Sequence, residues 1–105
     1  MAVNVDLNFK KNAIYTGGFE VLENLKDSKK AVGIKQTLKA VDRGNAEVVF
    51  IARDADEKLV DELKRACLKN SVEIIYADSM HQLGKACNIE VGAAAAAILK
   101  TISNP

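Results

Sequence analysis

Residues 33 to 44 read Gly-Ile-Lys-Gln-Thr-Leu-Lys-Ala-Val-Asp-Arg-Gly and follow a short apolar strand. A helix is predicted to begin directly after Gly33 and to end at Gly44. Apolar side chains at spacings of four and three fall on one face of this helix: Ile34, Leu38 and Val41. Three cations spaced four residues apart fall together on the far side: Lys35, Lys39 and Arg43. One face is therefore expected to pack on a core while the other displays positive charge.

The first turn of this helix has the features of an anion site. Its backbone N–H groups lack partners within the helix, and Gln36 and Thr37 lie beside them. Free N–H groups with nearby cations favour anions such as phosphate. Gly33 has no side chain, so the backbone of a partner can approach closely. A lysine stripe is more often a solvated face, so this stretch alone leaves nucleic-acid binding and plain surface both open.

The bulk composition indicates a single globular domain. The chain has 105 residues, of which 49% are apolar and 28% charged, which suffices for a core without disulfides or metal ions. No apolar run is long enough to cross a bilayer and no signal peptide is visible, so we expect a cytoplasmic protein without a membrane partner. Cys67 and Cys87 lie in separate expected helices without a CxxC motif, which favours reduced core thiols.

Charge is unevenly distributed, although the formal net charge is only +1. Residues 29–43 hold five basic residues against one acidic residue, and residues 54–62 hold five acidic residues against one basic residue. A protein with one basic and one acidic face is steered in its approach to a polyanion. As an alternative function, the acidic helix at residues 57–70 docks a partner in a protein-interaction module.

Helices and strands alternate along the chain. Residues 1–18 form an N-terminal extension with strand-like alternation, read as an added edge strand, a flexible leader or a remnant of cloning; residues 19–105 form the domain. Helices are expected over residues 19–30, 33–44, 57–70 and 79–88, strands over residues 30–33, 47–52 and 72–77, and a final turn over residues 100–104. Five alanines in residues 93–99 favour a helix by propensity, although a tightly packed strand is the other interpretation. The order predicts an α/β/α sandwich around a small, partly parallel sheet.

Local signals support two of these helices. The helix at residues 57–70 has an apolar stripe for the core: Leu59, Val60, Leu63, Ala66 and Cys67. Asp54 and Asp56 precede this helix and are expected to cap it rather than to bind an ion. Ser79 and Gln82 form a capping box for the next helix.

Two blocks of sequence together resemble the kink-turn-binding ribosomal-protein family, and most closely its small bacterial members of the YbxF and YlxQ type. One block is Gly33-Ile-Lys-Gln-Thr-Leu-Lys39 with Arg43-Gly44. The other is Ser79-Met-His-Gln-Leu-Gly-Lys-Ala-Cys-Asn-Ile-Glu-Val-Gly-Ala93. The resemblance covers roughly residues 19–99. It implies a three-layer α/β/α sandwich with a mixed four-stranded sheet, in which residues 93–99 form a strand.

The same resemblance implies a non-enzymatic protein, in ribosomes or on messenger leaders, that binds RNA kinked beside tandem sheared G·A pairs. It places the contacts at Gly33, Ile34, Lys35, Gln36, Thr37, Lys39, Arg43, Ile89, Glu90, Val91 and Gly92. Lys35 and Gln36 stand where archaeal and eukaryotic relatives carry Asn-Glu, yet an ammonium or amide still reaches guanine O6 and N7 in a widened major groove. Lys39 is implied to bridge guanine and phosphate, and Arg43 to contact phosphate. The loop at residues 89–91 is implied to pack against flipped-out bases.

Catalytic and metal chemistry find little support in the sequence. It contains no GxGxxG, no GxxxxGK[ST] and no pairing of a nucleophile with a base, so we expect no enzyme activity and no cofactor. His81 has no Cys or His partner at metal-ligand spacing. Together with the resemblance, these absences predict a non-enzymatic RNA-binding module, which we expect to be a monomer.

Overall fold

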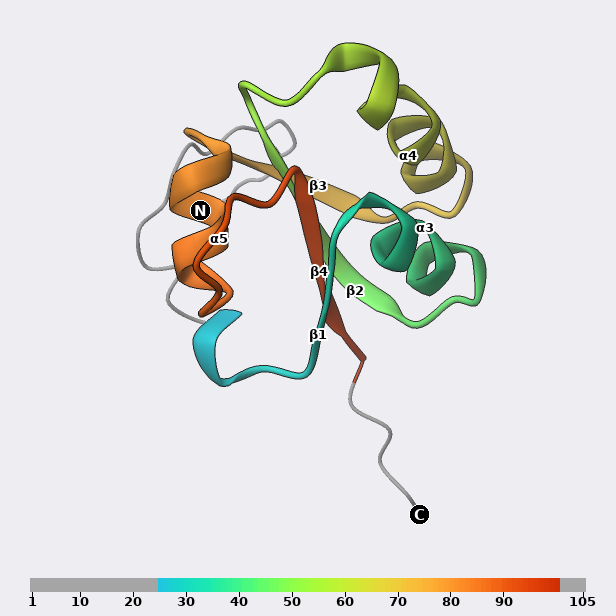
Figure 1. Cartoon of the computed structure of the whole chain (residues 1–105). Helices are drawn as coiled ribbons and strands as arrows, with labels where there is room; N and C mark the ends of the chain where they lie inside the picture. The colour runs from blue at the N-terminus through green and yellow to red at the C-terminus, as the bar shows by residue number, and fades with distance from the viewer. Residues whose placement is uncertain (1–24, 101–105) are drawn as a thin grey trace, which may run out of the picture.

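A computed structural model describes residues 25–100 and shows a four-stranded sheet with helices on both faces (Figure 1). The strands are β1 (Lys30–Val32), β2 (Ala46–Ala52), β3 (Glu73–Ala77) and β4 (Ala95–Leu99). Helices α3 (Ile34–Asp42) and α4 (Glu57–Lys69) cover one face. Helix α5 (Met80–Ala86) and a helical turn at residues 25–27 cover the other. This arrangement confirms the predicted three-layer α/β/α sandwich.

The element ends differ from the sequence expectations by a few residues. The helix expected over residues 19–30 ends at residue 27, because Lys30 pairs with Ile98 as the first residue of β1. The expected strand at 93–99 begins only at Ala95, after a loop. The N-terminal extension, the start of the first helix and most of the final turn lie outside the described residues.

The sheet is mixed and has the strand order β1-β4-β2-β3. Strand β4 is antiparallel to both β1 and β2, whereas β2 and β3 are parallel. Strands β1, β2 and β3 therefore run in one direction. Their carboxyl ends lie at the same end of the sheet as the beginning of β4, and we call this the loop end of the sheet. Because each of these strands is followed by a helix, the helix N-termini gather there too.

The alanine-rich segment is a strand because β4 lies in the middle of the sheet. Ala95 and Ala97 point to the face covered by α3 and α4, and Ala96 points to the face covered by α5. All three are fully buried. Small side chains let the helices of both layers approach the central strand, so the tertiary context overrides the helical propensity of alanine.

Helix α4 packs with a narrower stripe than its sequence predicts. Val60, Leu63 and Cys67 are buried against the sheet, and Ala66 packs beside them. Leu59 was expected in this stripe but is 58% exposed, so that prediction was wrong. Successive side chains of an α-helix are rotated by about 100° around its axis. Because Val60 points to the core, the neighbouring Leu59 points away from it.

All three fully described helices end in the same way, with a residue in the left-handed conformation just after the C-cap. These residues are Gly44 (φ 75°), Ser71 (φ 58°) and Asn88 (φ 68°). The next N–H group donates back across the last turn, as from Asn45 to the Ala40 carbonyl oxygen at 2.8 Å. This is the Schellman motif, which satisfies carbonyl groups that the helix leaves unpaired. The predicted stops at Gly44 and Asn88 are confirmed.

Candidate nucleic-acid interface

The three helix N-termini at the loop end differ in how they are capped. The Asp56 carboxylate accepts a hydrogen bond from the Lys58 N–H at 2.9 Å, and the Ser79 hydroxyl accepts one from the Gln82 N–H at 3.0 Å. The predicted caps at Asp56 and Ser79 are confirmed, but the second half of the predicted capping box differs: the Gln82 Oε1 accepts from the Asp78 N–H, at 3.1 Å, and not from the Ser79 N–H. Helix α3 begins at Gly33 without any side-chain cap. Of the three, only α3 therefore presents an uncapped first turn, with the N–H groups of residues 34–36 available to an outside acceptor.

Gly33 holds the start of α3 against the start of β4. Its N–H donates to the Ala95 carbonyl oxygen at 2.8 Å, and its backbone adopts φ 100° and ψ 155°. This region of backbone conformation is open almost only to glycine. A Cβ added here would meet nothing within 4 Å, so it is the conformation, and not the space, that requires glycine.

The loop at residues 89–92 is carried to the same place by α5 and β4. The Ile89 N–H donates to the Gly84 carbonyl oxygen at 3.0 Å, which anchors the start of the loop on α5. The Ala93 N–H donates to the Met80 carbonyl oxygen at 3.0 Å, and β4 then begins at Ala95 beside Gly33. The structure thus brings together two segments that lie more than fifty positions apart in the sequence.

Two glycines let this loop lie directly on α5. An added Cβ at Gly84 would stand 2.2 Å from the Val91 carbonyl oxygen, and one at Gly92 would stand 3.1 Å from the Met80 Cβ. Sequence reasoning missed Gly84. A glycine inside a helix destabilises the helix by about 1 kcal/mol relative to alanine. A glycine within a predicted helix therefore indicates that another backbone packs closely there.

The predicted contact residues divide into a surface set and a supporting set. Exposed members at the start of α3 and in the loop are Lys35, Gln36, Lys39, Glu90, Val91 and Gly92. The Val91 side chain is 71% exposed, which makes it an apolar surface on the loop that leads into β4. Ile34 and Ile89 are half-buried and pack against the two core clusters.

Thr37 and Arg43 do not join this surface. The Thr37 side chain is fully buried, and its hydroxyl oxygen has no hydrogen-bond partner among the described residues. The structure therefore does not bring it to the surface with Lys35 and Gln36. Arg43 is exposed but forms the C-cap of α3, about 14 Å along the helix axis from its first turn. Only a ligand that extends along the helix reaches both ends.

Asp54 acts differently from the sequence expectation. It was expected to cap the helix that follows it, but its carboxylate accepts a hydrogen bond from the Met80 N–H at 2.8 Å, at the start of α5. The β2–α4 loop is thereby fastened to the helix that carries the loop at residues 89–92. Local sequence could not show this contact, because the two residues lie 26 positions apart.

The other candidate chemical groups lie in ordinary environments. Cys67 and Cys87 are buried free thiols, and burial raises the pKa of Cys67 to about 11. His81 is exposed on α5. Among residues 25–100 no group of three or more His, Cys, Asp or Glu side chains is placed to hold a metal ion. Within the same residues no helix is both long and apolar enough to span a membrane.

Comparisons with known proteins agree with this architecture. The chain is 49% identical over 69 residues to "RNA-binding protein TTE2299" of Caldanaerobacter subterraneus, covering 66% of this chain and 84% of that protein. It is 43% identical over 76 residues to "RNA-binding protein YbxF" of Geobacillus stearothermophilus, covering 72% of this chain and 93% of that protein. The solved structure of the Giardia lamblia "15.5kD RNA binding protein" superimposes with a TM-score of 0.73 at 36% identity, covering 79% of this chain and 73% of that one.

The match to a known family extends over most of the chain. A profile of the ribosomal protein L7Ae/L30e/S12e/Gadd45 family matches residues 18–103. These residues include the whole sheet, all three described helices and both segments of the candidate interface. The chain therefore belongs to the ribosomal protein L7Ae/L30e/S12e/Gadd45 family.

Proposed function

We propose that this protein is an RNA-binding protein that recognises kink-turn RNA through the first turn of α3 and the loop at residues 89–92. The observation that carries the proposal is the pairing of these two segments at the loop end of the sheet. One supplies free N–H groups and the exposed side chains of Lys35 and Gln36, and the other supplies the exposed apolar side chain of Val91. Such a surface suits phosphates, guanine edges and an unstacked base together.

The family supports RNA as the ligand class. Its members are RNA-binding structural proteins and not enzymes, and the chain is accordingly not an enzyme. The relatives described above carry RNA-binding names, and the family includes ribosomal proteins. We therefore extend the proposal to a cytoplasmic protein that binds as a monomer, with ribosomal RNA or a messenger leader as its target.

The alternative of an acidic docking helix is weakened by the charges of α4. This helix contains three carboxylates and four cations, so it is not acidic as a whole. Two of the carboxylates are held by cations of the same helix, Glu57 by Lys64 at 3.1 Å and Asp61 by Arg65 at 2.7 Å. Paired surface charges of this kind offer a weaker attraction to a basic partner.

A titration with two fluorescent RNAs tests the proposal. One contains a kink-turn, and the other carries Watson–Crick pairs in place of its sheared G·A pairs. We expect the protein to prefer the kink-turn, and Gln36→Ala and Lys39→Ala each to weaken that complex by roughly 1–3 kcal/mol. Lys69→Ala, which removes an exposed cation in the last turn of α4, is the matched control and should leave the preference unchanged.

Equal and weak binding of both RNAs would contradict the proposal. If the affinity for both RNAs also fell with rising salt, and by a similar amount for each single lysine substitution, the positive side of α3 would act as a general electrostatic surface.

A further inference from the structure

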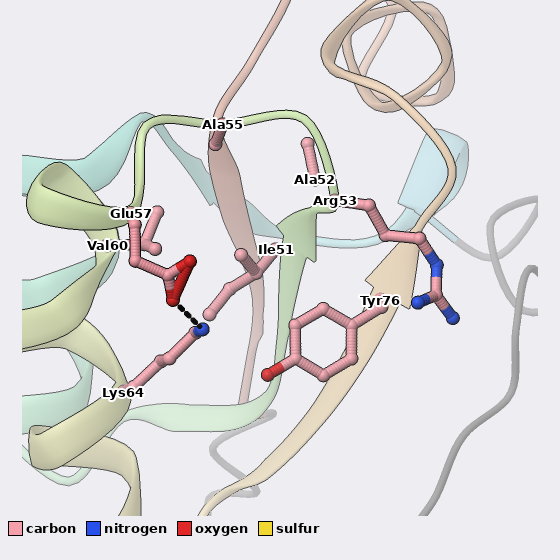
Figure 2. Close-up of a pocket in the computed structure, with 8 residues that line it drawn as sticks. All are labelled: Ile51, Ala52, Arg53, Ala55, Glu57, Val60, Lys64 and Tyr76. Carbon is pink, nitrogen blue, oxygen red and sulfur yellow. Dashed lines mark hydrogen bonds and ion pairs between the residues drawn. The ribbon is translucent and has the colours of Figure 1, made fainter.

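A concave site separate from the candidate interface lies at the outer side of the loop end, between α4 and the edge strand β3. It is a pocket of about 220 Å³ whose lining includes Arg53, Glu57, Lys64 and Tyr76 (Figure 2). One hydrogen bond connects its lining to the segment that follows the candidate interface. The Ala52 N–H donates to the carbonyl oxygen of Ala94, at 2.9 Å, and Ala94 lies two positions after the loop at residues 89–92.

The polar lining of the pocket consists of two cations on either side of one aromatic ring and the Glu57 carboxylate. The Arg53 guanidinium carbon lies 5.5 Å from the centre of the Tyr76 ring, and the Lys64 Nζ lies 5.7 Å from it. Arg53 forms no ion pair within residues 25–100, so its five donors remain available. Sequence reasoning missed this cluster, because its members come from a loop, a helix and a strand.

The size of the pocket limits its occupant. Sites that enclose a whole drug-sized ligand have volumes of about 300–1,000 Å³. A pocket of about 220 Å³ is better suited to one group of a larger ligand. Two cations, a phenol hydroxyl and an aromatic ring are the groups with which proteins follow the backbone of single-stranded nucleic acid.

We propose that this pocket binds a phosphate of a single-stranded RNA segment that continues beyond the candidate interface. The inference rests on the proposed function and extends it. Arg53 supplies a guanidinium just after β2 and Lys64 supplies an ammonium from α4, and the Tyr76 ring lies between them (Figure 2). The arginine fork matches the geometry of a phosphate, and the lysine adds a point charge.

Glu57 sets the strength of this site. Its carboxylate lines the pocket, lies 3.1 Å from the Lys64 Nζ and is 82% exposed. With Glu57 paired to Lys64, an incoming phosphate meets one free cation and one that is already partnered. Removal of the carboxylate charge by Glu57→Gln leaves both cations for the phosphate, so this variant should bind the single strand more tightly.

The test uses the full chain and one kink-turn duplex in two forms, blunt-ended and with single-stranded uridine tails. We expect the tails to raise the affinity of the wild-type protein, and Arg53→Ala to remove that gain, about tenfold, while leaving the blunt duplex unaffected. The salt dependence of tailed-RNA binding should become shallower by about 0.7 in the log–log slope, as for one lost phosphate. Arg65→Ala removes the same charge outside the pocket and is the matched control.

A variant that is expected to bind tailed RNA more tightly shows that the loss of affinity in Arg53→Ala is not caused by misfolding. Glu57→Gln should raise the affinity for tailed RNA about threefold or more and leave the blunt duplex unchanged, whereas Glu62→Gln, outside the pocket, should change neither. The inference is overturned if the tails add no affinity, or if Arg65→Ala loses the gain as fully as Arg53→Ala. It is also overturned if inorganic phosphate or uridine monophosphate occupies the pocket as tightly as the tail does. Failure of the proposed function appears separately, as a missing preference among the blunt RNAs.

Discussion

At the scale of single residues, the buried Cys67 thiol makes stability depend on pH. Burial raises its pKa from 9.0 to about 11, so the native state keeps a proton that the unfolded state releases. The stabilisation is complete below pH 9 and is lost as the pH rises towards 11, because the unfolded state then binds fewer protons. Over that interval we expect the free energy of unfolding to fall by about 1–3 kcal/mol through this group.

Denaturant unfolding of the wild type and Cys67→Ala between pH 8 and 11 measures this contribution. The variant should be less stable at pH 8, since it leaves a cavity, but should lose less stability as the pH rises. Parallel pH profiles for the two proteins would show that the thiol does not titrate as its burial requires.

Lys35, Gln36 and Thr37 show how far residue-level prediction reaches. Helical periodicity correctly places Lys35 and Gln36 on the exposed side of α3, because one hundred degrees per residue fixes the face once the core stripe is known. The same rule places Thr37 beside Val41, four positions on, at the buried face. The proximity of Thr37 to the first turn suggested a surface contact that its burial does not provide.

At the scale of elements, Gly84 controls where the loop at residues 89–92 lies. By helix propensity alone, Gly84→Ala would stabilise α5 by about 1 kcal/mol. The added Cβ would instead stand 2.2 Å from the Val91 carbonyl oxygen, so the loop must move. We expect a loss of about 1–3 kcal/mol in the free energy of unfolding, together with weaker kink-turn binding.

Gly44→Ala provides the comparison for this prediction. Gly44 has φ 75° and nothing within 4 Å of an added Cβ, so alanine strains the backbone far from the loop. This variant should lose stability and keep its intrinsic affinity for the RNA. A Gly84→Ala protein as stable as the wild type would contradict the close packing of α5 and the loop.

The contact between Asp54 and α5 gives a second prediction at this scale. Asp54→Ala removes the acceptor of the Met80 N–H, and we expect it to cost about 0.5–2 kcal/mol, as for the loss of a helix cap. Asp54→Asn keeps an oxygen at this position and should lose less. Thermal unfolding of both variants beside Asp42→Ala, an exposed carboxylate in the last residue of α3, measures the difference. Equal melting temperatures for all three variants would contradict a stabilising hydrogen bond between the Met80 N–H and the Asp54 carboxylate.

Most elements were predictable because each carries its own pattern. The continuous apolar run of β2 predicts a buried strand, and the amphipathic patterns of α3 and α4 predict helices. Strand β4 does not, since alanine is compatible with both conformations and only its neighbours in the sheet decide. The resemblance to a family predicted that residues 93–99 form a strand. The structure shows the physical reason, because β4 pairs with β2 along its length, with Val49 opposite Ala97.

At the scale of the whole molecule, the sheet topology decides where function is concentrated. Three strands of one direction bring the N-termini of α3, α4 and α5 to the loop end, together with the loop at residues 89–92 (Figure 1). Both segments of the candidate interface carry sequence motifs, so they could be selected from the sequence, whereas these motifs do not show the burial of Thr37 or the remote position of Arg43. The pocket between Arg53, Lys64 and Tyr76 was not predictable, because no local pattern joins a loop, a helix and a strand.

The location of the RNA on the protein is the central claim, and an NMR titration of isotopically labelled protein with a kink-turn RNA tests it most directly. We predict that the largest changes in amide chemical shift occur at residues 34–36 and 90–92, where free N–H groups and the exposed loop meet. The C-terminal half of α4 should remain nearly unchanged. Shifts concentrated on α4, with residues 34–36 and 90–92 unaffected, would contradict the account and would favour a partner docked on that helix.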